Sequence, residues 1–162
     1  MLDELDHVAA NLKTIEGQMR EAFAPCVETT YLQSEPGVGE MLAVVIWTEI
    51  GTIERFGRAE QLASYAGLVP REHSSGGKFH YGRVRKDVNL YLKWAFVEAA
   101  NSAVLNRQRC EYRHVDRLYQ NVKPRRGHGK AIVAIARHLA EAAFWMLKKG
   151  ESYRDPMSST QG

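Results

Sequence analysis

Apolar residues recur at alternating spacings of three and four along the first segment of the chain, which is the pattern of coiled-coil core positions. These positions are Leu5, Val8, Leu12, Ile15, Met19 and Ala22. Pro25 is expected to end the helix. Two interpretations stay open: the helix pairs with another helix, or its apolar face packs on its own domain. Because the pattern is already under way at the first residues, we expect the chain to begin inside a longer protein.

Helical periodicity continues through most of the remaining sequence, interrupted by glycine and proline. The pattern predicts helices over residues 28–34, 42–50, 58–66, 90–104, 112–122 and 132–147. Gly51 and Gly67 are expected to end the second and third of these helices, and Pro124 to close the fifth. The expected fold is therefore all-α.

The fourth predicted helix has a face that we expect to point into the core. That face is marked by Leu90, Trp94, Val97, Asn101 and Val104. Trp94 and Trp145 recur at helical spacing, and we expect both to pack in the core rather than to act as base-stacking platforms.

Two stretches have no helical period. Residues 71–85 are polar and glycine-rich, which predicts a long loop, with a small hairpin over residues 78–85 as an alternative. The polar stretch from Glu151 to Gly162 predicts a frayed tail. We expect the end of a coiled-coil segment over residues 1–24, a helical domain over residues 25–153 and a disordered tail over residues 154–162.

Composition narrows the class of protein. With 162 residues and 44% hydrophobic content, the chain has enough apolar material for one core. Cys26 and Cys110 are too few for a disulfide framework or a zinc site, and no apolar run is long enough for a membrane span. We therefore expect a cytoplasmic protein without a metal site of its own.

The positive charge is clustered, although the net charge is only +3. Clustered cations suit a polyanion, so double-stranded DNA is the expected partner. The first cluster contains Arg71, Lys78, Arg83, Arg85, Lys86 and Lys93. A second cluster forms a basic turn with Arg125, Arg126 and Lys130, where the start of a helix also favours an anion.

The segment from Leu32 through Pro36-Gly37-Val38-Gly39 to Ala43 has the spacing of a helix-hairpin-helix element. Gly37 and Gly39 would let backbone N–H groups approach a phosphate without reading its base sequence. A plain hairpin of two helices, whose glycines serve only packing, is the alternative.

The polar loop contains a candidate nucleophile. A serine hydroxyl at Ser74 or Ser75 can attack phosphorus if a base removes its proton and cations stabilise the growing negative charge. His73 stands next to the serines, as a possible base or as an exposed loop histidine. On local chemistry alone, a Ser-Ser-Gly-Gly stretch is most often a flexible surface loop.

The order of the motifs resembles the carboxy-terminal domain of the IS110/IS116/IS902 family of insertion-sequence transposases. The resemblance covers residues 32–153 and rests on Pro36-Gly37-Val38-Gly39, Gly67-Leu68-Val69-Pro70, Ser74-Ser75-Gly76, Ala99-Ala100 and residues 131–137. It implies that Ser75, with Ser74 as fallback, forms a covalent phosphoserine link to DNA. It also implies a RuvC-like nuclease domain whose carboxylates hold magnesium, and oligomers that assemble on a guide RNA, the bridge RNA.

The chain departs from the family pattern after the loop. Lys86-Asp87-Val88-Asn89 is followed by Lys93 where the family carries an arginine, so a phosphate clamp there would lose its bidentate geometry. Because the nuclease domain is not among these residues, we expect the isolated chain to be inactive. A non-catalytic module for nucleic-acid binding or oligomerisation is the alternative function.

Overall fold

The computed structural model describes residues 2–22, 26–69, 88–107 and 113–157. Every regular element in these ranges is a helix, which confirms the all-α class. The elements are α1 Leu2–Ala22, α2 Val27–Gln33, α3 Glu40–Ile50, the 3-10 turn η1 Ile53–Arg55, α4 Ala59–Tyr65, α5 Leu90–Leu105, α6 Arg113–Arg126 and α7 His128–Lys149. None of these helices has the length and apolar character that crossing a membrane requires.

Helix α7 is the centre of the domain and contacts α2, α4, α5, α6 and η1. Alanines on its buried face, such as Ala136 and Ala140, are fully buried and let the neighbouring helices approach closely. The helical periodicity over residues 132–147 agrees with the structure. Its apolar positions Ile132, Ile135, Ala136, Leu139, Ala143 and Met146 are buried, and Leu147 is partly buried.

The inward face of α5 differs from the predicted one. Its buried residues are Leu92, Ala95, Phe96, Ala99, Ala100, Ala103 and Val104. Leu90 is 63% exposed and Trp94 is 52% exposed, so the prediction that they mark the core face was wrong. Val104 of the predicted face is buried and Val97 packs against the core, as expected. Small alanines carry most of the buried face, so a pattern weighted towards large apolar residues misplaced Leu90 and Trp94.

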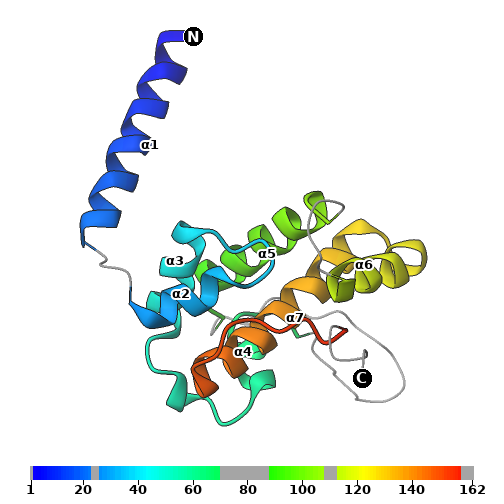
Figure 1. Ribbon diagram of the computed structural model, residues 1–162. Helices are drawn as coiled ribbons and strands as arrows, with labels where there is room; N and C mark the ends of the chain where they lie inside the picture. Colours follow the sequence, from blue (N-terminus) through cyan, green and yellow to red (C-terminus); the bar gives the residue numbers. More distant parts are fainter. Residues whose placement is uncertain (1, 23–25, 70–87, 108–112, 158–162) are drawn as a thin grey trace.

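Helix α1 stands away from the rest of the molecule (Figure 1). Leu5, Val8, Leu12 and Ile15 of its apolar seam are 52–62% exposed. An ion pair of 3.0 Å joins Arg20 of this helix to Glu40 of α3. The interpretation in which the seam packs on its own domain is therefore wrong, and the coiled coil stays a prediction.

Helix α6 continues past Pro124, which was expected to close it, and ends at Arg126. A proline in the last turn removes one backbone donor and leaves the turns before it intact. Gly127 makes the actual break, because it adopts a φ of +84° that side chains rarely tolerate. The first residue of α7 follows it directly.

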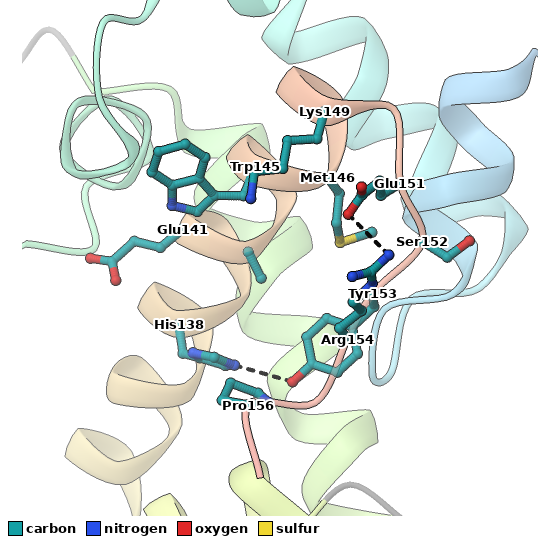
Figure 2. Close-up of a pocket in the computed structure, with 11 residues that line it drawn as sticks. His138, Glu141, Trp145, Met146, Lys149, Glu151, Ser152, Tyr153, Arg154 and Pro156 are labelled. Atoms are coloured by element: carbon teal, nitrogen blue, oxygen red, sulfur yellow. Dashed lines mark hydrogen bonds and ion pairs between the residues drawn. The ribbon is translucent and has the colours of Figure 1, made fainter. Parts of the chain in front are cut away.

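The segment after α7 is held against the domain over residues 151–157. The backbone N–H of Tyr153 donates a 2.7 Å hydrogen bond to Ser34 Oγ, and its hydroxyl lies 3.2 Å from His138 Nε2 (Figure 2). Asp155 accepts a hydrogen bond from the backbone N–H of His114. The frayed tail expected from Glu151 onwards is therefore wrong for these seven residues, which the periodicity could not reveal because they are not helical.

Candidate nucleic-acid interface

The predicted nucleophiles Ser74 and Ser75 lie outside the described residues. The same holds for His73 and for the basic residues Arg71, Lys78, Arg83, Arg85 and Lys86. The structure describes the two places at which this stretch leaves and rejoins the domain, after Val69 and before Val88.

These two ends meet beside α4. The backbone N–H of Asn89 donates a 2.9 Å hydrogen bond to the carbonyl oxygen of Tyr65. A Cβ on Gly67, whose φ is +68°, would lie 2.4 Å from Val88 Cγ1. The chain closes so tightly here that glycine is required, and the described residues on either side of positions 70–87 meet at one corner of the domain.

Asn89 ties this corner together through its side chain. Its Oδ1 accepts the backbone N–H of Leu92 at 2.9 Å and so caps α5, while its Nδ2 donates to Glu49 Oε2 at 2.6 Å and to Tyr65 Oη at 3.3 Å. Capping side chains of this kind satisfy an otherwise unpaired donor at a helix start. Lys93, predicted to contact DNA, lies on the first turn of α5 and is partly buried.

The hairpin between α2 and α3 contains two glycines whose surroundings differ. Gly37 has a φ of +77°, and a Cβ on it would lie 2.0 Å from the carbonyl oxygen of Ala99 in α5. Gly39 precedes α3, and a Cβ on it would meet nothing within 4 Å. Packing against α5 accounts for Gly37, whereas the space beside Gly39 is open to a ligand.

Glu35, in the same hairpin, is a residue that sequence reasoning missed. It is 1% exposed, and neither carboxylate oxygen has a hydrogen-bond partner in the described part of the chain. Burial raises the pKa of this carboxyl well above its usual value, because desolvation disfavours the charged form. A glutamate before a proline turn gives no sequence signal of burial, since such residues are ordinarily exposed.

The basic turn between α6 and α7 is solvent-exposed. Arg125, Arg126 and Lys130 are all exposed, and they flank Gly127 at the start of the 22-residue helix α7. The first backbone N–H groups of a helix and its dipole favour an anion at that end. The structure thus brings these three predicted DNA contacts to one helix start.

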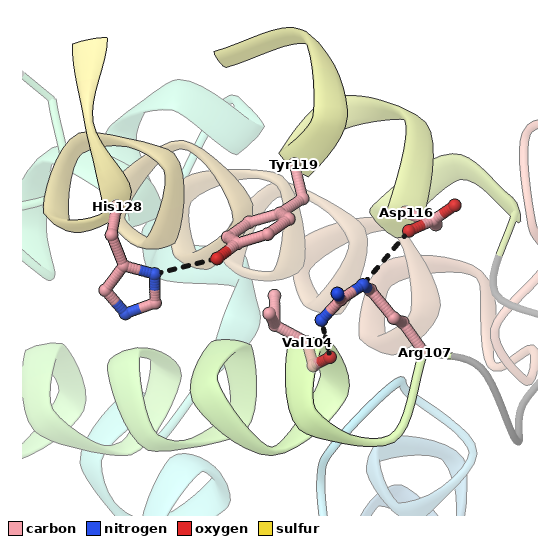
Figure 3. A network of polar contacts seen from close by, with 5 residues as sticks. All are labelled: Val104, Arg107, Asp116, Tyr119 and His128. Atoms are coloured by element: carbon pink, nitrogen blue, oxygen red, sulfur yellow. Dashed lines mark hydrogen bonds and ion pairs between the residues drawn. The ribbon is translucent and has the colours of Figure 1, made fainter. Parts of the chain in front are cut away.

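Tyr119 fixes the geometry behind this turn. Its hydroxyl lies 2.9 Å from His128 Nδ1 (Figure 3). The Nζ of Lys123 lies 5.2 Å from the centre of the tyrosine ring. Arg107 approaches the same ring at 5.2 Å and pairs with Asp116 at 3.4 Å. This network attaches the turn to the carboxyl end of α5.

The described residues of the candidate interface therefore form two groups. Asn89 and Lys93 lie at the amino end of α5, whereas Gly37 and the basic turn are connected to its carboxyl half through Ala99 and Arg107. An α-helix of 16 residues is about 24 Å long, which is shorter than one turn of a DNA duplex of about 34 Å. The two groups therefore lie on opposite halves of α5 and do not form one compact pocket.

The exposed tryptophans correct a second expectation. Trp145, predicted to lie in the core, is 52% exposed. It lines a groove of about 350 Å³ between α7 and the segment that follows it, and Lys149 Nζ lies 5.4 Å from its ring centre (Figure 2). Helical spacing alone did not separate this surface position from a core position.

Comparison with known proteins gives the family. A protein-family model described as "Transposase IS116/IS110/IS902 family" matches residues 29–115 of the sequence. This range includes the hairpin, the serine loop and α5. The chain is 33% identical over 123 residues to the transposase for insertion sequence element IS1111A of Coxiella burnetii, covering 76% of this chain and 34% of that protein.

Two further relatives match nearly the whole chain. An uncharacterized 43.6 kDa protein of insertion element IS110 from Streptomyces coelicolor is 30% identical over 97% of this chain and 38% of its own length. A probable family 20 transposase of Pseudomonas aeruginosa is 28% identical over 94% of this chain and 45% of its own length. The chain spans less than half of each of these relatives, and by its match to the family model it belongs to the IS116/IS110/IS902 family of transposases.

Proposed function

We propose that this chain is the DNA-binding and strand-transfer part of an insertion-sequence transposase, carboxy-terminal to a nuclease domain. The match of the family model over residues 29–115 carries the proposal, because it includes the serine loop and the elements that anchor its two ends. Anchoring by Asn89 and Gly67 supports it, since a nucleophile needs a fixed frame from which to reach its substrate.

The chemistry assigned to the loop is attack by the Oγ of Ser75, or of Ser74, on a phosphodiester. The new bond joins serine Oγ to phosphorus, and a P–O bond to one deoxyribose oxygen breaks. The serine proton goes to a base, and the leaving oxygen takes up a proton to become a hydroxyl. Nearby cations stabilise the charge on the phosphoryl oxygens.

Magnesium, which the family resemblance implies, does not fit the described residues. No group of three or more histidine, cysteine, aspartate or glutamate side chains in the described ranges is arranged to hold a metal ion. The acidic residues of α1, such as Glu4 and Asp6, are exposed along one isolated helix. We therefore expect the metal-binding carboxylates to lie outside the described residues.

DNA binding is assigned to the basic turn between α6 and α7 together with Gly39. A titration of duplex DNA at several salt concentrations tests this, because each lost phosphate contact lowers the slope of log affinity against log salt by about 1. We expect the double variant Arg125→Gln/Arg126→Gln to lower that slope by about 2. The control is Arg154→Gln, an exposed arginine paired with Glu151. No binding by the unaltered chain at low salt contradicts the assignment.

Self-association is assigned to α1, whose apolar seam is exposed from Leu5 to Ile15. Sedimentation of the whole chain should show concentration-dependent oligomers that Leu12→Glu abolishes. Lys13→Glu, next to the seam, is the matched control and should leave association unchanged. A monomer at all concentrations contradicts this assignment. A guide RNA is a further proposed partner of the assembled protein.

A further inference from the structure

Arg55 is an exposed arginine in the 3-10 turn between α3 and α4, held against two aromatic rings. Its guanidinium carbon lies 5.0 Å from the ring centre of Phe56 and 4.7 Å from that of Tyr65. The two rings are themselves neighbours, with centres 5.5 Å apart and planes inclined by 51°. Such a stack restricts the guanidinium before any ligand arrives.

The aromatic support is fixed from behind. Phe56 is buried, at 6% exposure. The hydroxyl of Tyr65 lies 3.3 Å from Asn89 Nδ2, which also donates to Glu49. The corner that anchors residues 70–87 is thus the same corner that supports Arg55.

Most hydrogen-bonding capacity of Arg55 is unused within the described residues. A guanidinium has five N–H donors, and one of them makes a long bond of 3.5 Å to the carbonyl oxygen of Ile50. The ion pairs among described residues do not include Arg55. Glu49, the carboxylate in the supporting network, accepts its hydrogen bond from Asn89.

A purely structural role accounts for the stacking but not for the exposure. A cation–π contact uses the face of the guanidinium. The contact leaves N–H donors at the edge of the guanidinium facing solvent. Two of these donors can form parallel hydrogen bonds to two oxygens of one phosphate.

We propose that Arg55 binds a backbone phosphate of the DNA strand that reaches the corner where residues 70–87 begin and end. The inference rests on the proposed function, because it needs DNA as the ligand. Arg55 then marks a phosphate-binding position at the amino end of α5, separate from the basic turn at its other end.

The test is the same salt titration of duplex DNA with the whole chain, comparing Arg55→Gln, Arg55→Lys and the control Arg58→Gln. Arg58 is exposed three residues away and has no ring contact in the described structure. We expect Arg55→Gln to weaken binding roughly tenfold and to lower the salt slope by about 1. Arg55→Lys should keep the slope and weaken binding less, because the charge remains and the fork is lost. Arg58→Gln should leave the slope as it is.

The outcomes separate this inference from the proposed function. A salt slope for Arg55→Gln equal to that of the unaltered chain overturns the phosphate contact and leaves DNA binding standing. A loss of thermal stability without a change of slope means that Arg55 serves only the fold, and also overturns it. Absence of DNA binding by the unaltered chain overturns the proposed function and this inference together.

Discussion

The side-chain amide of Asn89 donates a 2.6 Å hydrogen bond to the carboxylate of Glu49, 40 positions earlier in the sequence. The contact joins the end of α3 to the start of α5, across the point where residues 70–87 leave and rejoin the domain. The same asparagine caps α5 through Leu92. One side chain therefore fixes both the start of a central helix and the frame of the serine loop.

Asn89→Ala removes the helix cap and leaves Glu49 without this donor. We expect the free energy of unfolding to fall by about 1–3 kcal/mol, from the lost cap and the unpaired, partly buried carboxylate. Urea unfolding measures this free energy. Asn101→Ala, inside α5 and at neither end of the helix, is the control and should change stability little. Equal stability of the two variants contradicts the role of Asn89.

The two hairpin glycines should respond differently to the same substitution. Gly37→Ala places a methyl group 2.0 Å from the Ala99 carbonyl oxygen at a φ of +77°, so we expect a loss of more than about 2 kcal/mol or failure to fold. Gly39→Ala meets open space and should cost under about 1 kcal/mol. Thermal unfolding of the pair measures the difference. Similar losses for both would show that α5 does not press on Gly37.

Glu35 should make stability depend on pH. Because burial raises its pKa in the folded state above the usual 4.5, the folded protein keeps this proton longer than the unfolded chain. The contribution of this proton to the free energy of unfolding is fully present below pH 4.5. It falls as pH rises, by up to about 1.4 kcal/mol per pH unit, until the carboxyl of the folded protein ionises. Glu35→Gln should therefore gain stability over the unaltered chain as pH increases, measured by urea unfolding. The control is Glu60→Gln, which removes one exposed negative charge and leaves the buried Glu35 in place. A difference that is constant with pH contradicts the buried, neutral carboxyl.

His138 should stay neutral to unusually low pH. Burial, the neighbouring His114 and, in the opposite direction, Asp155 bring its pKa to about 4. The stability that the neutral ring contributes is present above pH 6.5 and is lost as pH falls towards 4. NMR titration should give a midpoint near 4 that His114→Gln raises and Asp155→Asn lowers. A midpoint near 6.5 means that the ring is not enclosed by α6 and the segment after α7.

Much of the fold follows from the sequence, because long amphipathic helices, and the glycines that end helices, give strong local signals. Helix α7 and its buried positions are predicted by periodicity, and Gly51 ends α3 as expected, with a φ of +63°. The buried face of α5 is predicted only in part, because alanines carry most of it, whereas the large side chains Leu90 and Trp94 are exposed. Periodicity identifies the helix but does not choose between two faces of similar hydrophobicity.

The candidate site is predicted less completely than the fold. The basic turn is found from its charges, since exposed cations are visible in the sequence. The Asn89–Glu49 contact and the burial of Glu35 depend on elements that meet only in three dimensions. Arg55 gives no sequence signal either, because its stack needs Tyr65 of α4 to face the turn.

The central claim is that a serine of this chain attacks DNA, and covalent trapping tests it most directly. The whole chain, supplied with the nuclease part of a family transposase and a nicked element end, should yield a DNA–protein adduct that survives denaturation. Mass spectrometry should place the phosphodiester on Ser75, or on Ser74, and Ser75→Ala should abolish it or move it to Ser74. An adduct of unchanged yield in the Ser74→Ala/Ser75→Ala double variant contradicts the account.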